Sequence, residues 1–169
     1  MEIKTTITYR GAIAAFGTRA INDVLRQAFM AAGQHWGRHF LMKHFTRAGA
    51  REYGYEPRKG ENARPGSKRF KRIAGPEEKR MGQILPLVYS GQLRRAAAYY
   101  RVTAAATSKR VYTTVTLPQA HGFNRLDEKY RGDISRISDA ELKVLTELIN
   151  ARIASGLNDL DATRTVRIG

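Results

Sequence analysis

The chain contains no cysteine, which excludes disulfide bonds and thiolate metal sites. It has 15 acidic residues against 30 lysines and arginines, so few carboxylates are present for acid–base catalysis or for a two-metal centre. No run approaches the roughly 20 apolar residues that span a bilayer. Met1–Lys4 does not begin a signal peptide. We therefore expect a soluble, unexported protein with no membrane partner.

The formal net charge of +15 on 169 residues favours binding to polyanions or to acidic protein surfaces. The charge is uneven: between Lys43 and Arg80, twelve basic residues stand against five acidic ones. The apolar content of 42% is typical of a globular protein. We predict one folded domain over residues 1–169.

Four stretches show strong periodicity. Glu2–Arg10 alternates with period two and predicts an opening strand. Apolar residues at helical spacing over Ile13–Phe45 predict one long bent helix or two stacked helices. Two alternating runs, Tyr100–Ala106 and Val111–Leu117, are joined by a short polar loop and predict a β-hairpin.

The segment before the hairpin, Leu85–Leu93, is apolar with Pro86 near its start. It predicts the beginning or edge of a strand, followed by a bend at Ser90–Gly91. Gln92–Ala98 is rich in helix formers, and we interpret it as a short helical turn that leads into strand.

Residues 50–82 are polar, strongly basic and punctuated by glycine and proline. Such long irregular stretches in compact domains are usually functional or disordered. We interpret residues 50–82 as an extended basic arm or loop that grips a partner. The alternative is a surface loop whose charge only aids solubility.

A second irregular segment, Pro118–Ile137, precedes a late helix. Ser138 and Glu141 form a capping box at its start, and Gly156 is a natural C-cap. Arg164–Ile168 predicts a closing strand that adds to a sheet edge. The predicted fold class is α+β: an antiparallel sheet covered on one face by the long N-terminal helix and the C-terminal helix.

A search for catalytic chemistry finds little. His35 and His39 have the i, i+4 spacing of a metal-binding pair, but no third ligand lies near in sequence, and packing is the commoner role of such a pair. Ser90 precedes Gly91 without the leading glycine of a nucleophile elbow. We therefore predict no enzyme activity, no catalytic residues, no metal and no cofactor.

Seven cations of the arm are candidates for contact with a partner or with DNA: Arg58, Lys59, Arg64, Lys68, Arg69, Lys71 and Arg72. They could neutralise several phosphates and give salt-dependent binding without sequence preference. Tyr53, Tyr55 and Phe70 are interleaved with them, in positions to stack on bases. An acidic protein partner fits the same charges, and both alternatives stay open.

The chain resembles the head–tail joining and tail-completion proteins of tailed bacteriophages, a group that includes tail terminators and virion-morphogenesis proteins. The long helix, the basic tyrosine-containing stretch and the late helix carry part of the resemblance. Its most specific part is the segment Pro86–Arg94, similar to the family pattern P-L-V-x-[ST]-G-x-L-[RK]. The matching residues are Pro86, Leu87, Val88, Ser90, Gly91, Leu93 and Arg94.

This resemblance implies a structural virion protein of the neck or proximal tail, present in the host cytoplasm during assembly. Such subunits form hexameric or, in some cases, dodecameric rings that contact portal, connector and tail-tube proteins and enclose the DNA channel. The basic composition differs from the acidic channels of tail tubes and favours acidic partner subunits or DNA near the head exit. The alternative is a nucleic-acid-binding module without sequence preference.

Overall fold

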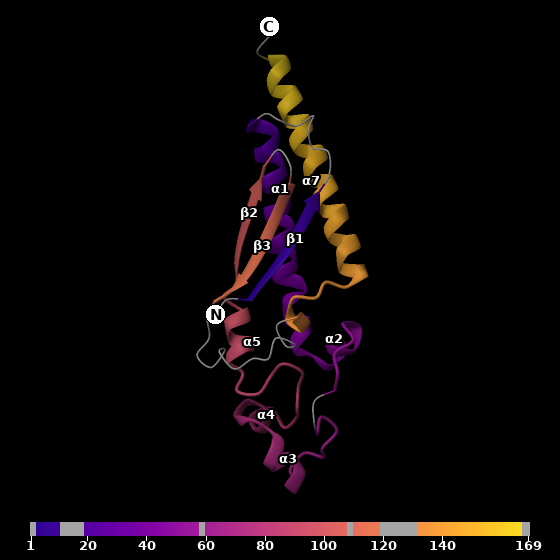
Figure 1. Ribbon diagram of the computed structural model, residues 1–169. Helices are drawn as coiled ribbons and strands as arrows, with labels where there is room; N and C mark the ends of the chain where they lie inside the picture. The colour runs from indigo at the N-terminus through magenta and orange to yellow at the C-terminus, as the bar shows by residue number, and fades with distance from the viewer. Residues whose placement is uncertain (1–2, 11–18, 58–59, 108–109, 119–131, 167–169) are drawn as a thin grey trace. The chain divides into compact units, whose positions relative to one another are not determined.

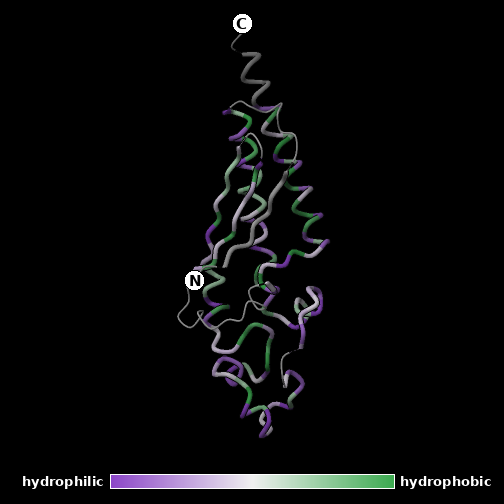
Figure 2. The backbone as a smooth tube through the Cα atoms, in the orientation of Figure 1, coloured by the Kyte–Doolittle hydropathy of each residue, from purple (hydrophilic) through white to green (hydrophobic). Residues whose placement is uncertain are grey.

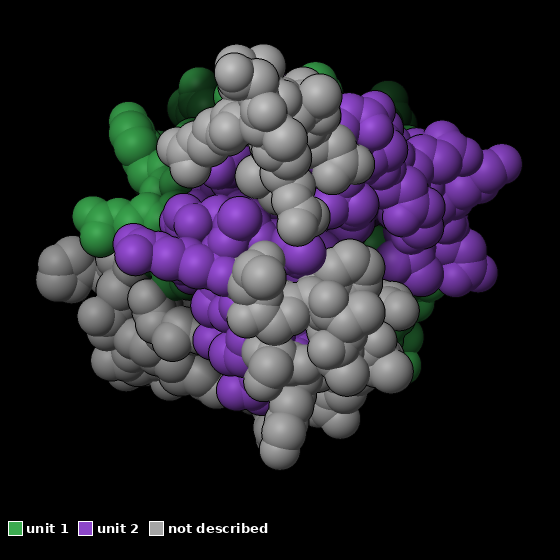
Figure 3. Space-filling view, turned by 90° about the horizontal axis from the view of Figure 1, so that it is seen from above, with its two compact units in different colours: residues 1–3, 37–101, 116–138 green, residues 4–36, 102–115, 139–169 purple. Residues whose placement is uncertain are grey.

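The computed structural model describes residues 3–10, 19–57, 60–107, 110–118 and 132–166. It divides into two compact units, coloured separately in Figure 3. Unit 1 comprises residues 1–3, 37–101 and 116–138, and unit 2 comprises residues 4–36, 102–115 and 139–169. The single folded domain over residues 1–169 stays a prediction. No helix of the described residues is both long enough and apolar enough to cross a membrane.

Unit 2 is built on a three-stranded sheet. Its strands are β1 (Ile3–Arg10), β2 (Arg101–Ala106) and β3 (Arg110–Leu117), in the order β1-β3-β2. The arrows of β1 and β2 run opposite to that of β3 in Figure 1, so the sheet is antiparallel. At the hairpin loop the backbone N–H of Thr107 donates to the carbonyl of Arg110 over 2.8 Å. The predicted opening strand and hairpin are confirmed.

One face of this sheet is covered by two helices, α1 (Arg19–His39) and α7 (Asp139–Val166). Residues of β3 alternate between buried and half-buried positions, and Val111 belongs to a core cluster with Leu25 and Phe29 of α1. Ile149 and Ile153 of α7 pack against the same cluster. The α+β fold, with both long helices on one sheet face, is therefore confirmed.

The backbone of α1 approaches the sheet closely at Gly33. A Cβ atom at this position would lie 2.5 Å from Oγ1 of Thr113 and 2.7 Å from Cγ1 of Val102. The glycine therefore serves helix–sheet packing, which explains its place inside a helix. Of the predicted helical stretch Ile13–Phe45, residues 13–18 lie outside the described residues, and the last part, Leu41–Phe45, forms the separate 3₁₀ helix η1.

The late helix begins directly after Ser138, as predicted, but the predictions for its end are wrong. α7 continues through Gly156 to Val166, so Gly156 is not its C-cap and residues 164–166 are not strand. A Cβ atom on Gly156 would lie 2.6 Å from Cγ1 of Val24, so this glycine allows α1 and α7 to approach closely. Once a helix is nucleated, each further residue adds a hydrogen bond, and one glycine opposes this by only about 1 kcal/mol.

Unit 1 contains the short helices α2 (Arg47–Glu52), α3 (Lys68–Ile73), α4 (Pro76–Met81) and α5 (Gln92–Ala97). Three of these helices lie wholly or partly in residues 50–82, which the sequence analysis expects to be irregular. Phe70, Ala74 and Ile84 form a buried cluster with Ala63 packed against it. In Figure 2 the α3 and α4 region is largely purple, with short green stretches where apolar residues occur. Widely spaced apolar residues thus suffice to fold this basic region.

The predicted helical turn after Gly91 is confirmed as α5, whereas the predicted strand at Leu85–Leu93 is wrong. The structure has only an isolated bridge between Leu85 and Val88, closed by a turn in which the N–H of Val88 donates to the carbonyl of Leu85 over 3.3 Å. Pro86 has no N–H to donate to a sheet, and Leu87 has a φ of 54°, incompatible with an extended strand.

Candidate partner-binding surface

Helix α3 presents cations on its surface and buries its one aromatic ring. Its N-cap is Ser67, whose Oγ accepts a hydrogen bond from the N–H of Phe70 over 3.2 Å. The Phe70 side chain is only 5% exposed and fixes the helix on the cluster with Ala74 and Ile84. The remaining polar positions of the helix are all exposed: Lys68, Arg69, Lys71 and Arg72. Within the described part of the chain none of these four forms an ion pair.

Helix α4 follows after Gly75 and is stabilised at both ends. Pro76 occupies its first turn, where a missing N–H costs nothing. The carboxylate of Glu78 accepts a hydrogen bond from the N–H of Gly75 over 2.7 Å, and Gly82 ends the helix in the left-handed conformation with a φ of 71°. Glu78 is fully buried, so its carboxyl group bonds the start of the helix and is not presented to a partner.

The neighbouring acid, Glu77, connects α4 to α5. Its carboxylate accepts two hydrogen bonds from Arg80, over 2.6 and 3.1 Å, and lies 3.7 Å from Nη1 of Arg95. The hydrogen bonds from Arg80 lower the pKa of the Glu77 carboxyl below its usual value, although burial opposes this shift. Glu77 is therefore ionised near neutral pH and holds two arginines in place.

The family-like segment Pro86–Arg94 passes directly over the start of α4. The N–H of Glu77 donates to the carbonyl of Tyr89 over 3.3 Å, and a Cβ atom on Gly75 would lie only 2.3 Å from that carbonyl oxygen. Gly91, with a φ of 74°, makes the bend into α5, where Arg95 donates to the carbonyl of Ser90 over 3.1 Å. The segment is a turn held against α4.

Of the seven cations proposed from the sequence, Arg58 and Lys59 lie outside the described residues. Arg64 and the four cations of α3 are exposed in unit 1, as an interaction surface requires. In the family-like segment, Val88 and Leu93 are buried, and Arg94 is half-buried. The two parts belong to the same unit and are joined through α4.

The aromatic residues chosen for base stacking are largely unsuitable, which corrects that prediction. Tyr53 is 6% exposed and stacks on His44, with ring centroids 4.0 Å apart and planes at 4°. The hydroxyl of Tyr55 contacts Nδ1 of His44 and donates to the carbonyl of Asp133 over 2.5 Å. Phe70 is buried in its own cluster. These rings therefore belong to the packing of unit 1.

The exposed tyrosines of unit 1 are different ones. Tyr89 is 59% exposed and Tyr99 is 75% exposed. Tyr89 belongs to the family-like segment, and Tyr99 follows α5. Both tyrosines lie after the basic stretch of residues 50–82, so sequence reasoning that considered only the aromatics within that stretch missed them. The burial of Glu77 and Glu78 was also not predicted, although the position of both in the first turn of a helix, after Gly75–Pro76, is a usable signal.

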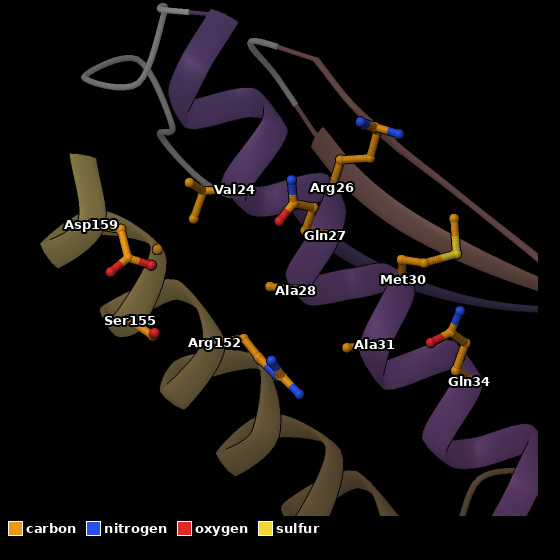
Figure 4. A pocket seen from close by; sticks show the side chains of 11 residues that line it. Val24, Arg26, Gln27, Ala28, Met30, Ala31, Gln34, Arg152, Ser155 and Asp159 are labelled. Carbon is orange, nitrogen blue, oxygen red and sulfur yellow. The ribbon is translucent and has the colours of Figure 1, made fainter. Parts of the chain in front are cut away.

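Unit 2 has a pocket of about 380 Å³ between α1 and α7. In Figure 4 the side chain of Arg152 extends from α7 toward α1, while Ser155 and Asp159 lie further along α7. None of the sequence-predicted site residues lines this pocket. The histidine pair considered for metal binding, His35 and His39, gains no third ligand: within the described residues no three His, Asp or Glu side chains form a group suited to a metal ion.

Comparisons with family models, with curated proteins and with solved structures found no match to this chain. The arrangement itself is a cationic surface: α3 carries exposed cations, the nearby Glu77 and Glu78 are buried, and a tight turn is hydrogen-bonded to α4. Such a surface can bind negatively charged macromolecules.

Proposed function

We propose that the protein is a structural subunit of a tailed-bacteriophage particle, part of a ring at the head–tail junction or the proximal tail end that joins the capsid and portal to the tail. The resemblance of Pro86–Arg94 to the tail-completion group supports this proposal. The observation that carries it is the cationic surface of α3, which stands exposed while Glu77 and Glu78 are buried. Such a surface suits an acidic neighbouring subunit.

The burial of the two acids strengthens the charge argument. Between Lys43 and Arg80 the sequence has five acids, and two of them are directed inward. Glu77 pairs with Arg80 and Arg95 and leaves the four cations of α3 exposed. Complementary charge steers association and selects partners more than it adds affinity, which suits the ordered assembly of a particle.

Ring formation is tested by native mass spectrometry and negative-stain electron microscopy of the full chain at 0.15 and 1 M salt. A closed ring of six or twelve subunits is the expected species, because a head-to-tail contact that closes by rotation gives a discrete oligomer. A monomer at every concentration, also when mixed with portal and tail-tube proteins of the same particle, contradicts the proposal.

The role of α3 is tested by replacing Lys68, Arg69, Lys71 and Arg72 with glutamine. The matched control replaces four other exposed cations, Arg19, Arg38, Arg51 and Lys143, and so changes the net charge equally. We expect the α3 variant to lose co-assembly with the acidic partner while the control variant keeps it. Equal loss in both variants means that only the total charge matters.

A second candidate function, nucleic-acid binding without sequence preference, is favoured by the two exposed tyrosines. Tyr89 and Tyr99 lie on the same unit as the exposed Arg95 and Arg101. Exposed rings can stack on unpaired bases, at about 1–3 kcal/mol per base, while arginines of the same unit contact phosphates. Gel shifts with a single-stranded oligonucleotide then weaken steeply as salt rises, and Tyr89→Ala together with Tyr99→Ala reduces binding.

A further inference from the structure

A second feature of unit 1 is a pocket of about 450 Å³ formed by η1, α2, α4 and the start of α5. Its lining includes Met42, Phe45, Arg47, Met81, Leu85 and Arg94. We propose that this pocket is a docking site for an acidic segment of a partner protein, which inserts one apolar side chain and places a neighbouring carboxylate on Arg94.

The interior of the pocket is apolar and adaptable. Phe45 and Leu85 are 2% and 7% exposed, and they provide a fixed hydrophobic surface. Met42 is 38% exposed, which is unusual for a large apolar side chain beside a pocket. Methionine has three rotatable bonds and a polarisable sulfur, so Met42 and Met81 can adjust to an inserted side chain. This composition suits a leucine-sized or larger apolar residue.

The edge of the pocket is cationic. The guanidinium of Arg47 donates to the carbonyls of Glu61 and Ile84, over 3.3 and 3.4 Å, and these bonds hold it in place. Nη1 of Arg94 lies 3.4 Å from Sδ of Met81, a weak acceptor. A guanidinium has five N–H donors, so Arg94 retains donors for a carboxylate, and such charge-assisted bonds are the stronger kind.

Charge complementarity selects the occupant. Among the described residues no acid lines the pocket, and the whole chain carries a formal net charge of +15. An acidic segment of a partner is therefore attracted to the pocket. The apolar interior in turn gives a nucleic-acid backbone little to bind. An acidic segment with one apolar residue satisfies both parts of the pocket.

This inference goes beyond the proposed ring, because it requires an acidic partner and no particular assembly. It also gives a role to Arg94, the last residue of the family-like segment, and to Met42, which the sequence analysis does not single out. Its test is a peptide-binding measurement on the full chain, so a failure of ring assembly leaves the result interpretable.

The chain has four methionines, so ¹³C-methyl labelling of methionine gives few and separable NMR signals. The probe is the synthetic peptide acetyl-Glu-Glu-Leu-Glu-Glu-amide, titrated to about 5 mM in 0.15 M salt, since weak docking lies in the millimolar range. We expect saturable shifts of the Met42 and Met81 signals. Met30, which lines the pocket of unit 2, is expected to stay unchanged.

Two control peptides separate the contributions. Replacing the glutamates with glutamine, or the leucine with serine, is expected to weaken binding about tenfold each, as loss of one charge-assisted bond or one buried apolar side chain does. Arg94→Gln is expected to weaken binding about tenfold, Arg94→Lys less, and Arg69→Gln on α3 less than twofold.

Several outcomes overturn the proposal. The proposal is wrong if the peptide causes no shifts of the Met42 and Met81 signals. It is also wrong if Arg94→Gln and Arg69→Gln weaken peptide binding equally, because this indicates unspecific charge attraction. Shifts of the same signals on dilution without peptide identify a second copy as the occupant. Competition by an oligothymidylate for the same signals identifies a nucleic acid.

Discussion

The indole Nε1 of Trp36, in α1, donates a hydrogen bond to the carboxylate of Glu141, in the first turn of α7, over 3.4 Å. Both residues are 1% exposed and lie 105 positions apart in the sequence. The bond joins the two long helices of unit 2 beside the sheet. A buried carboxylate that loses a donor keeps its desolvation cost, so this contact matters for stability.

We expect Trp36→Phe to lower the free energy of unfolding by about 2 kcal/mol, because it removes the donor and part of the buried ring. Urea unfolding of the variant and of the natural chain measures this difference in the free energy of unfolding. In a double-mutant cycle with Glu141→Leu, the coupling energy should reach about 1 kcal/mol. The control is Glu147→Gln, an exposed acid of the same helix, expected to change stability by less than about 0.5 kcal/mol. Strict additivity of the two changes contradicts a direct bond.

Stability should fall in mild acid because of His44. Burial lowers its pKa from 6.5 to about 4, although a hydrogen bond to the backbone at Asp133 opposes the shift. Between these values the unfolded chain binds the proton and the folded chain does not, so stability is present above pH 6.5 and is lost as the pH falls to 4. The full shift corresponds to about 3 kcal/mol.

The check is urea unfolding at pH 7 and pH 4.5 for the natural chain and for His44→Phe, which keeps a ring to stack on Tyr53. We expect the variant to show less acid destabilisation than the natural chain. His39→Gln, at an exposed position, should leave the pH dependence unaltered. An identical pH profile for all three proteins shows that His44 does not titrate in this range.

Gly75→Ala should destabilise unit 1 by about 2 kcal/mol or more. The new Cβ atom meets the carbonyl oxygen of Tyr89 at 2.3 Å, and backbone atoms cannot yield as a flexible side chain does. Gly132→Ala is the matched control, because nothing lies within 4 Å of a Cβ atom there. Thermal unfolding of both variants gives the comparison, and an unchanged Gly75→Ala protein argues against the close approach of α4 and the turn.

Gly156→Ala tests the corrected role of that residue. Its Cβ atom would lie 2.6 Å from Cγ1 of Val24, so we expect a loss of about 1–3 kcal/mol from overpacking. Val24→Ala in the same chain should restore part of this loss, because it removes the methyl groups in contact. If Gly156 acted as a C-cap instead, Val24→Ala would give no such rescue in the double-mutant cycle.

Periodicity in the sequence was sufficient to predict the elements with long amphipathic patterns. The hairpin, the opening strand and the start of α7 follow from local alternation, from helical spacing and from a serine before the helix. The α+β class follows from them as well, because two helices with apolar faces and a half-apolar sheet have few ways to bury those faces.

The basic region was harder to predict, because its helices are too short to show a period. A six-residue helix such as α3 has only one or two apolar positions. In α3 the burial of Phe70 against residues outside the helix provides the stability that the helix lacks by itself. The exposed charge of α3 was apparent from the sequence, whereas the burial of Glu77 and Glu78 was not. The pocket beside Arg94 depends on residues from three separated stretches.

The sequence alone determined the charge, the absence of cysteine and the main helices and strands, since these depend on composition and on neighbours along the chain. Only the tertiary structure decided that Gly156 lies inside α7, that Leu85–Val88 turns without joining the sheet, and that Tyr53 stacks on His44. Gly156 meets Val24 of another helix, the turn is held on α4 by the bond from the N–H of Glu77 to the carbonyl of Tyr89, and Tyr53 meets His44 of η1. These contacts form only in the folded chain, and local patterns do not encode them.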